Sequence, residues 1–272
     1  LERVVRYLAE HGLGSPEVRA AATDGQALER LLRMTFREAT RYYVDVTRLP
    51  GRTPADVERR LVVETPDVVE QALGREAPVI LSAMHFGEVE FPALLAAVRT
   101  GKPVVAPMET LGDPALQDWI RRTRSSVGVE VVPLRNARRT LLDALADGRS
   151  VGLVGDRNVA GGVISLPFFG APAPLPMGPA LLSVESGRPL YLAAVRRTRA
   201  GHYSGALTAV DVPATGQRRE RVEVAMANLV AAMEAQIARA PHQWWSLLSP
   251  IWPDLDPRAA TGTGHLEPEA AA

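Results

Sequence analysis

The sequence contains no cysteine, and Lys102 is its only lysine. Without cysteine there can be no disulfide, no thiol nucleophile and no thiolate-bound zinc, so any catalysis must use oxygen or nitrogen groups. Because lysine is so scarce, almost all of the positive charge is carried by arginine, which binds carboxylates and phosphates through two parallel hydrogen bonds where arginines cluster. The totals of Lys+Arg and Asp+Glu are equal at 31 each, so the net charge indicates no particular partner.

Several sequence features of common enzyme classes are also missing. No G-x-S-x-G, H-E-x-x-H, Walker or G-x-G-x-x-G pattern occurs in a suitable context, which removes the main support for a serine hydrolase, a zinc protease, a nucleotide triphosphatase or a dinucleotide-dependent dehydrogenase. No apolar run reaches the roughly 18 to 20 residues that a membrane-spanning helix needs. The composition, with 46% hydrophobic and 23% charged residues, is typical of a globular protein.

A length of 272 residues is compatible with one large α/β domain, here expected over residues 1–255. In residues 1–75 the apolar positions of Leu1 to Leu13 and Ala27 to Leu49 recur at helical spacing, which predicts amphipathic helices. From Ala77 onward, short apolar runs alternate with helical stretches. These runs are "APVILSA", "KPVVAPM", "VEVVPL", "SVGLVGD", "PLYLAAVRR" and "GALTAVDV".

Short strands that are apolar throughout are typical of a mostly parallel sheet that is covered on both faces. We therefore predict a three-layer α/β/α sandwich, with the α/β core in residues 76–255 and the N-terminal helices attached to it. Residues 256–272 lack periodicity and are expected to form a mobile tail.

The stretch "VILSAMHFGEVEF" ends an apolar run at His85 and places Glu90 five residues later. The spacing alone is common by chance, but its context is informative. Gly87 permits a tight turn, and Pro92 suits the first turn of a helix. His85 is therefore expected at the carboxyl end of a buried strand, where open α/β sheets bind their ligands.

An imidazole that is oriented by a carboxylate can remove the proton of a hydroxyl group while that hydroxyl attacks an ester or thioester. We expect Glu90 to contact the His85 ring in this way. The alternative is a histidine at the end of a strand with Glu90 as a solvated acid in the next helix.

Other candidate residues come from three places in the sequence. Asp156 and Arg157 end the strand "SVGLVG" and so belong to the same sheet edge as His85, although an ordinary turn with a surface ion pair would look alike. Arg124 in "WIRRTRSS" is a candidate phosphate ligand, or part of a solvated helix face. Phe168 and Phe169 fall in the Pro- and Gly-rich stretch "LPFFGAPAPLPMG", which is expected to be a loop that either lines an acyl channel or packs back on the core.

The sequence resembles a known family at these residues. "HFGEVE" is similar to the H-x4-D/E motif of the lysophospholipid acyltransferase superfamily. "GLVGDRNVAGGVISLPFFGAPAPLPMGPALLSVESGRPLYLAAVRR" resembles its branch of bacterial lipid A acyltransferases and actinobacterial phosphatidylinositol mannoside acyltransferases. The likeness runs from about Phe36 to Asp254. Where that branch usually has Gly-Asn-Trp or Gly-Asn-Phe, this chain has Glu88 and Val89 after the glycine, so Glu88 is a candidate contact of the acceptor.

The resemblance implies an O-acyltransferase that moves a fatty acyl group from acyl-CoA, or acyl carrier protein, to a hydroxyl of a glycolipid such as a phosphatidylinositol mannoside. His85 and Glu90 would be catalytic, with no acyl-enzyme, no metal and no cofactor besides the acyl-CoA co-substrate. Asp156 would orient His85 or the acceptor, and Arg157 would meet an oxyanion or a phosphate. The expected location is cytoplasmic and peripheral at the inner face of the cell membrane, with lipid rather than nucleic acid as partner.

Three alternatives stay open from the sequence. The acceptor can be another sugar or a secondary metabolite, the chain can be a non-catalytic protein that binds acyl-CoA or lipid, or it can be a plain acyl-CoA hydrolase.

Overall fold

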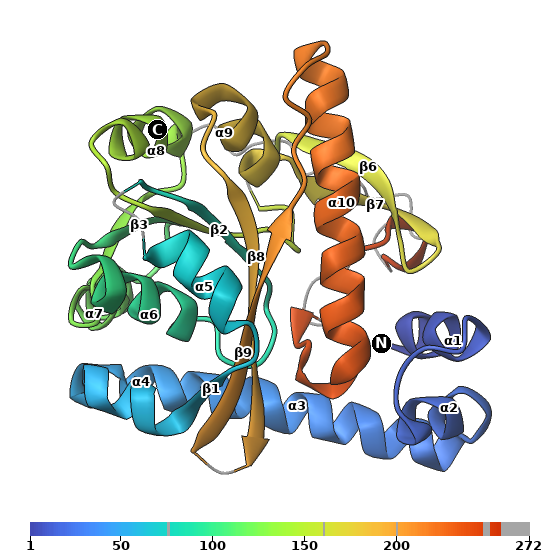
Figure 1. Cartoon of the computed structure of the whole chain (residues 1–272). Helices are drawn as coiled ribbons and strands as arrows, with labels where there is room; N and C mark the ends of the chain where they lie inside the picture. The colour runs from blue at the N-terminus through green and yellow to red at the C-terminus, as the bar shows by residue number, and fades with distance from the viewer. Residues whose placement is uncertain (75–76, 160, 200, 247–250, 257–272) are drawn as a thin grey trace.

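The computed structural model describes residues 1–74, 77–159, 161–199, 201–246 and 251–256 (Figure 1). Of the expected mobile tail, only Asp256 belongs to these ranges, and the rest lies outside the described residues.

A central sheet of seven strands organises the chain, in the order β1-β9-β8-β2-β5-β3-β4. Its strands are β1 (Leu61–Val63), β2 (Ile80–Ala83), β3 (Val104–Met108), β4 (Val129–Pro133), β5 (Val151–Val154), β8 (Leu190–Arg199) and β9 (His202–Val210). All neighbours pair in parallel except β8 and β9, which form an antiparallel pair. The predicted mostly parallel α/β fold is confirmed, and each apolar run named above forms a strand.

The central strands are largely apolar because both faces of the sheet are buried there, whereas β4 carries the exposed Glu130 and β8 ends in arginines. In β2, Ile80 packs into one hydrophobic cluster, whereas its neighbour Leu81 packs into another on the opposite face. Helices α8 (Ala137–Ala146), α9 (Gly178–Ser186) and α10 (Arg218–Arg239) contribute to the first cluster, and α5 (Pro66–Leu73) and α6 (Phe91–Thr100) to the second. Figure 1 shows these two helical layers on either side of the sheet.

The remaining helices lie at the margins of the sandwich. They are α1 (Glu2–Glu10), α2 (Pro16–Thr23), α3 (Gly25–Thr47), α4 (Pro54–Arg60) and α7 (Pro114–Ser125), with the short 3-10 helices η1 (Leu49–Gly51), η2 (Pro241–Gln243) and η4 (Pro253–Leu255). The predicted N-terminal helices are thus present. Strand β1 also falls within residues 1–75 and extends the sheet beside β9, so this part of the chain is not purely helical.

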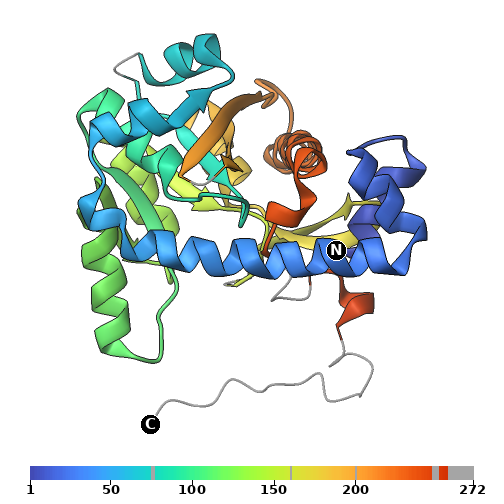
Figure 2. The ribbon, with the colours of Figure 1, turned by 90° about the horizontal axis from the view of Figure 1, so that it is seen from below.

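Helix α3 runs across the lower end of the molecule, where the carboxyl ends of β2 and β5 point (Figure 2). Its start is fixed by Asp24, whose side chain accepts hydrogen bonds from the backbone N–H groups of Gln26 and Ala27. The helix therefore covers the sheet edge at which His85 was expected. None of the helices in the described ranges has the length and apolar character needed to cross a membrane.

The stretch "LPFFGAPAPLPMG" is not the loop that we expected. Val163–Phe168 and Ala171–Pro176 form an antiparallel hairpin, β6 and β7, outside the main sheet. The prolines of β7 occupy alternate positions, so the nitrogen atoms that lack a proton all face one edge of the strand. In a two-stranded hairpin each strand has a free edge, and a strand with three prolines is tolerated there.

Candidate active site

His85 lies just beyond the carboxyl end of β2, in a short loop that is held by backbone hydrogen bonds from two sides. The backbone N–H of Trp245 donates to the His85 carbonyl at 2.8 Å, and that of Gly87 donates to the Gln243 carbonyl at 2.9 Å. On the other side, the backbone N–H of Glu88 donates to the carbonyl of Val195 at 2.9 Å. The loop is therefore clamped between strand β8 and the segment that follows α10.

Gly87 is required by this clamp. Its φ is +57°, in the left-handed region, and a Cβ atom at this position would lie 2.0 Å from the carbonyl oxygen of Val195. The tight turn predicted at Gly87 is thus present, and it exists because the backbone must approach β8 closely.

The carboxylate in contact with the His85 ring belongs to Asp156. Its Oδ1 is 2.7 Å from His85 Nδ1, and its Oδ2 accepts hydrogen bonds from the His85 backbone N–H at 3.0 Å and from Trp244 Nε1 at 2.8 Å. Asp156 is completely buried, whereas the His85 side chain is 20% exposed. Both oxygens of the carboxylate are therefore fixed, and the ring is held on its Nδ1 side.

Electrostatics favour the ionised form of the Asp156 carboxyl group. Burial alone would raise the pKa of Asp156, but the neighbouring His85 and the hydrogen bonds from His85 and Trp244 outweigh it, so the pKa of Asp156 lies below its usual range. An ionised carboxylate only accepts hydrogen bonds, so Nδ1 of the ring must carry a proton. In the neutral ring, Nε2 is then the atom that can accept a proton from another group.

Glu90 does not hold the His85 ring as we expected. Its Oε1 accepts hydrogen bonds from Arg124 Nε at 3.0 Å, Arg124 Nη2 at 2.8 Å and the Tyr42 hydroxyl at 3.1 Å. Glu90 immediately precedes α6, and its buried side chain points to α7 and α3, which carry these partners. Burial would lower the pKa of Arg124, but the Glu90 charge more than offsets this and raises it. Glu90 thus links α6, α7 and α3 to one another instead of orienting the histidine ring.

Glu88 is 1% exposed, and neither of its carboxylate oxygens has a hydrogen-bond partner among the described residues. Burial, with the nearby charges of Asp45 and Glu90, raises the pKa of Glu88 to about 8. It does not belong to the lining of the cavity at His85 in the described part of the chain. The expected contact between Glu88 and an acceptor is therefore not supported by its position.

A cavity of about 390 Å³ opens beside His85, within the range typical of ligand sites. Its mouth carries the polar side chains of His85, Arg124 and Arg157, and Arg157 Nη2 is 2.7 Å from Glu109 Oε1. Further residues of its lining are apolar and come from the ends of β4 and β5 and from α8 and α9, among them Leu134, Leu141, Leu153, Met177, Leu181 and Leu182. The sequence-predicted residues His85, Asp156, Arg124 and Arg157 are thus brought together at one sheet edge.

Phe168 and Phe169 are not part of this cavity lining in the described ranges. They are buried, and the Phe168 ring packs at 5.7 Å from Trp244 and 6.0 Å from Trp252, between ring centroids. Phe169 packs against Phe168 and Trp244. The two rings pack back on the core, whereas the end of the same stretch, Pro176 to Gly178, lines the cavity beside His85, so each of the two possibilities that the sequence left open is realised in part. That these rings bind substrate stays a prediction, which their position outside this cavity lining does not support.

Sequence reasoning did not identify the aromatic residues around the histidine. The Trp245 ring meets the His85 ring edge-on, with centroids 4.9 Å apart, and stacks on Tyr42 at 4.4 Å. Trp244 binds Asp156. The dipeptide was visible in "PHQWWSLLSP", but nothing in its spacing shows that a segment after α10 folds back onto the loop after β2.

Comparison with known proteins finds relatives that share one printed name. The chain is similar to a phosphatidylinositol mannoside acyltransferase of Mycolicibacterium smegmatis, with 27% identity over 86% of this chain and 77% of the relative. It is also similar to the protein of the same name from Mycobacterium tuberculosis strain CDC 1551, with 28% identity over 68% of this chain. This second match spans 62% of the length of the relative.

The family model described as bacterial lipid A biosynthesis acyltransferase matches residues 23–252, which include both strands of the candidate site, the Glu90–Arg124 pair and the tryptophans after α10. The chain therefore belongs to the bacterial lipid A biosynthesis acyltransferase family.

Proposed function

We propose that this protein transfers a fatty acyl group from acyl-CoA to a hydroxyl group of a phosphatidylinositol mannoside. The observation that carries the proposal is the contact between His85 Nδ1 and Asp156 Oδ1 at the mouth of a largely apolar cavity. The family and the printed activity of the mycobacterial relatives support it.

In the proposed reaction, His85 Nε2 takes the proton of the acceptor hydroxyl while the hydroxyl oxygen attacks the thioester carbonyl carbon. The tetrahedral oxyanion then collapses, the carbon–sulfur bond breaks, and the departing thiolate receives the proton from the imidazolium. Asp156 stabilises the imidazolium that forms in between. No acyl-enzyme forms, and the mechanism assigns no step to a metal or cofactor.

Two arginines at the mouth of the cavity are assigned to the donor. Arg157 lines the cavity and is 29% exposed, and its ion pair with Glu109, which is 42% exposed, is screened by solvent. We assign the Arg157 guanidinium to a phosphate or an oxyanion of the donor. Arg124 keeps its place through Glu90, because two of its nitrogen atoms bond to the same carboxylate oxygen. Glu90 thus acts on substrate only through Arg124.

The apolar part of the cavity is assigned to the acyl chain. Leu141, Leu153 and Leu182 line it, and burial of apolar chain is worth about 0.8 kcal/mol per CH₂ group. A chain that lies in this cavity brings its carbonyl carbon to the mouth, where His85 is found.

The acceptor lipid places the reaction at a membrane surface, which we assign to the cytoplasmic face of the cell membrane with peripheral attachment. Flotation of the protein with liposomes tests this assignment. Failure to float with any anionic or neutral composition would contradict it.

The activity is tested by measuring acyl transfer from palmitoyl-CoA to a phosphatidylinositol mannoside with the wild type and the His85→Ala variant. General-base assistance contributes about 10² to 10⁴ in rate, so the variant should lose about that much. Equal rates would contradict the mechanism. Acceptor screening by mass spectrometry distinguishes another sugar acceptor, release of free thiol without an acceptor indicates a hydrolase, and binding without turnover indicates a non-catalytic protein.

A further inference from the structure

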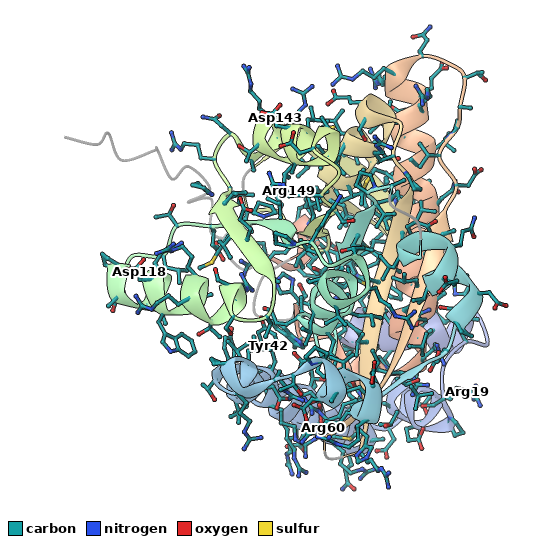
Figure 3. The ribbon with its side chains drawn as sticks, turned by 60° about the vertical axis from the view of Figure 1, so that its left-hand side comes forward. Arg19, Tyr42, Arg60, Asp118, Asp143 and Arg149 are labelled. Carbon is teal, nitrogen blue, oxygen red and sulfur yellow. The ribbon has the colours of Figure 1, made fainter. Side chains whose placement is uncertain are left out.

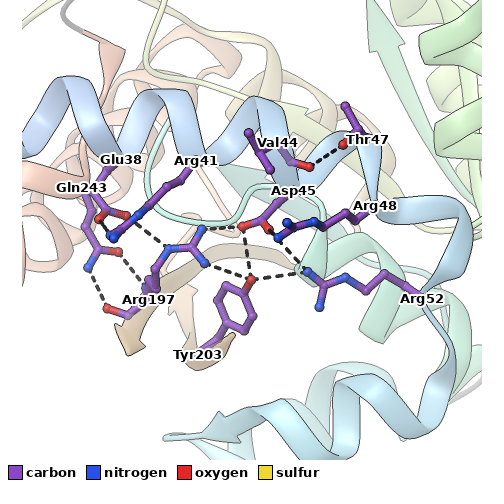
Figure 4. Close-up of polar contacts among 10 residues, drawn as sticks. All are labelled: Glu38, Arg41, Val44, Asp45, Thr47, Arg48, Arg52, Arg197, Tyr203 and Gln243. Carbon is purple, nitrogen blue, oxygen red and sulfur yellow. Dashed lines mark hydrogen bonds and ion pairs between the residues drawn. The ribbon is translucent and has the colours of Figure 1, made fainter. Parts of the chain in front are cut away.

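A second cavity, of about 420 Å³, lies between α3, α4, the end of β8 and the start of β9. Its lining is rich in arginine and contains Arg41, Arg48, Arg52, Arg60 and Arg197. We call it the arginine pocket. Figure 3 shows Arg60 at the lower end of the molecule, and Figure 4 shows the other four guanidinium groups gathered along the end of α3.

Positive charge exceeds negative charge in the arginine pocket. Asp45 and Asp56 are the carboxylates of its lining, and Glu38 lies behind it. Five guanidinium groups thus meet three carboxylates, which leaves an excess of two positive charges. In a partly enclosed space this excess attracts an anion.

Two of the arginines, Arg48 and Arg60, make only long contacts with the carboxylates of the pocket. Arg197 is fully engaged, since it donates to Asp45 Oδ2 at 2.5 Å and to Glu38 Oε2 at 3.2 Å. By contrast, Arg48 approaches Asp45 only to 3.8 Å, and Arg60 approaches Asp56 only to 3.9 Å, beyond hydrogen-bond distance. Both side chains are at least one-third exposed, so their N–H donors can turn to a ligand.

Arg52 is the most enclosed arginine of the five, with a side chain 7% exposed. Its Nη2 is 3.4 Å from the Tyr203 hydroxyl and 3.7 Å from Asp45 Oδ1, whereas its buried Nη1 has no hydrogen-bond partner among the described residues. A buried donor without a partner costs free energy that a ligand oxygen recovers when the guanidinium turns toward it. The guanidinium also lies over the Phe91 ring, 5.2 Å from its centroid, which keeps it near the pocket.

We propose that the arginine pocket binds a phosphate group, as the free anion or as part of a lipid head group. Phosphate matches the pocket because its several oxygens accept the paired N–H donors of more than one guanidinium group at once.

The proposed phosphate site is distinct from the cavity at His85. On α3, Asp45 points into the arginine pocket, whereas Tyr42 points to Glu90 and Trp245 on the side of the candidate active site. The two cavities share no lining residue in the described part of the chain, although Tyr42 and Asp45 lie about one turn apart on α3. The inference goes beyond acyl transfer and does not require it.

The test compares a pocket variant with a charge-matched control. Arg48→Gln/Arg60→Gln removes two charges from the pocket and leaves the buried arginines in place. Arg33→Gln/Arg121→Gln removes two charges from exposed sites, where each arginine pairs within its own helix. All of these side chains are at least one-third exposed, so both double variants should fold.

In the first arm, inorganic phosphate is titrated into each full-length protein by calorimetry in a buffer free of phosphate. In the second arm, the proteins are floated with phosphatidylcholine vesicles that do or do not contain phosphatidylinositol. The pocket variant should bind about tenfold more weakly than the wild type in at least one arm, and the control should stay within about twofold.

A pocket-dependent loss in the calorimetric arm supports a site for phosphate itself, and one seen only with phosphatidylinositol vesicles supports a lipid head group. Equal affinity of the wild type and the pocket variant in both arms would overturn the proposal. An equal loss of affinity in the control variant would also overturn it, because that result reflects overall charge. Absence of binding by the wild type in both arms would overturn it as well.

A third variant tests the geometry of the buried arginine. Arg52→Lys keeps the charge but loses the planar fork, so phosphate binding should weaken severalfold while a thermal unfolding scan verifies that the fold is kept. Unchanged binding by a folded Arg52→Lys protein would exclude Arg52 from the site. None of these readouts depends on acyl transfer, so failure here and failure of the proposed activity are distinguishable.

Discussion

The Asp156→Asn substitution tests most directly which carboxylate serves His85. It keeps the size of the side chain and removes its charge. An asparagine can still accept the hydrogen bond of Trp244 Nε1 or of the His85 backbone N–H through its single oxygen. Its amide group, however, donates hydrogen bonds and opposes a protonated Nδ1. The ring then favours the tautomer with a proton on Nε2, the atom that is proposed to accept the proton of the acceptor.

The magnitude follows from the contact between the ring and the carboxylate. A unit charge about 4 Å away stabilises the imidazolium by ~4 kcal/mol at an effective dielectric constant of 20. Because Oδ1 is 2.7 Å from Nδ1 and Asp156 is fully buried, screening by solvent is weak. Part of this energy is already present in the ground state as a hydrogen bond to the neutral ring. We expect a net loss of about 3 to 5 kcal/mol, or about 10² to 10⁴ in rate.

The assay is acyl transfer from palmitoyl-CoA under saturating donor, with Asp118→Asn as a control that removes an exposed carboxylate from the outer part of α7 (Figure 3). The control should keep the wild-type rate. The reasoning is refuted if folded Asp156→Asn keeps a rate within about threefold of the wild type while Glu90→Gln falls to the level of His85→Ala. That result would return the orienting role to Glu90.

Two further substitutions act on buried acids near the site. Glu90→Gln leaves the half-buried Arg124 charge without its partner, so the free energy of unfolding should fall by about 1.5 to 3 kcal/mol, measured by urea denaturation; a loss under 1 kcal/mol would contradict the described pairing. Glu88→Gln should stabilise the protein at neutral and higher pH. Because the pKa of Glu88 is raised to about 8 in the folded state, the wild type loses stability as pH rises from the unfolded pKa toward 8, whereas the variant does not. The free energy of unfolding of Glu88→Gln minus that of the wild type, measured by urea denaturation from pH 5 to 9, should grow by a few kcal/mol and level off above pH 8. A difference that does not change with pH would show that Glu88 is ionised at all these pH values.

The sequence allowed the strands to be predicted because burial on both faces makes the central part of the sheet largely apolar. Hairpin β6–β7 escaped the same reasoning, since its prolines are typical of loops and only the free strand edges of a two-stranded hairpin tolerate them. The sandwich was thus predictable in its core. The departures lie at its margins, where β1 joins the sheet from within the N-terminal helices.

The positions of His85, Arg124 and the sheet edge were predictable, and the family resemblance offered Asp156 as a residue that orients His85 or the acceptor, but the spacing argument gave the wrong partner for the ring. Spacing along the chain favoured Glu90, five residues from the histidine. The register of the sheet decides otherwise: Ala83 of β2 lies opposite Val154 of β5, so the residues two positions beyond each, His85 and Asp156, emerge side by side. Strand neighbours cannot be deduced from the order of the strands in the sequence, because β3 and β4 lie between β2 and β5 along the chain and beyond β5 in the sheet.

The two acids near His85 therefore divide between chemistry and architecture. Asp156 touches the ring and determines which nitrogen carries the proton. Glu90 holds Arg124 at the cavity and ties α6 and α7 to Tyr42 of α3, the helix that also carries Asp45 of the arginine pocket. If this division holds, Asp156→Asn lowers the rate of acyl transfer more than Glu90→Gln does, and Glu90→Gln lowers the free energy of unfolding more than Asp156→Asn does. Rate and unfolding measurements on the two variants separate these effects.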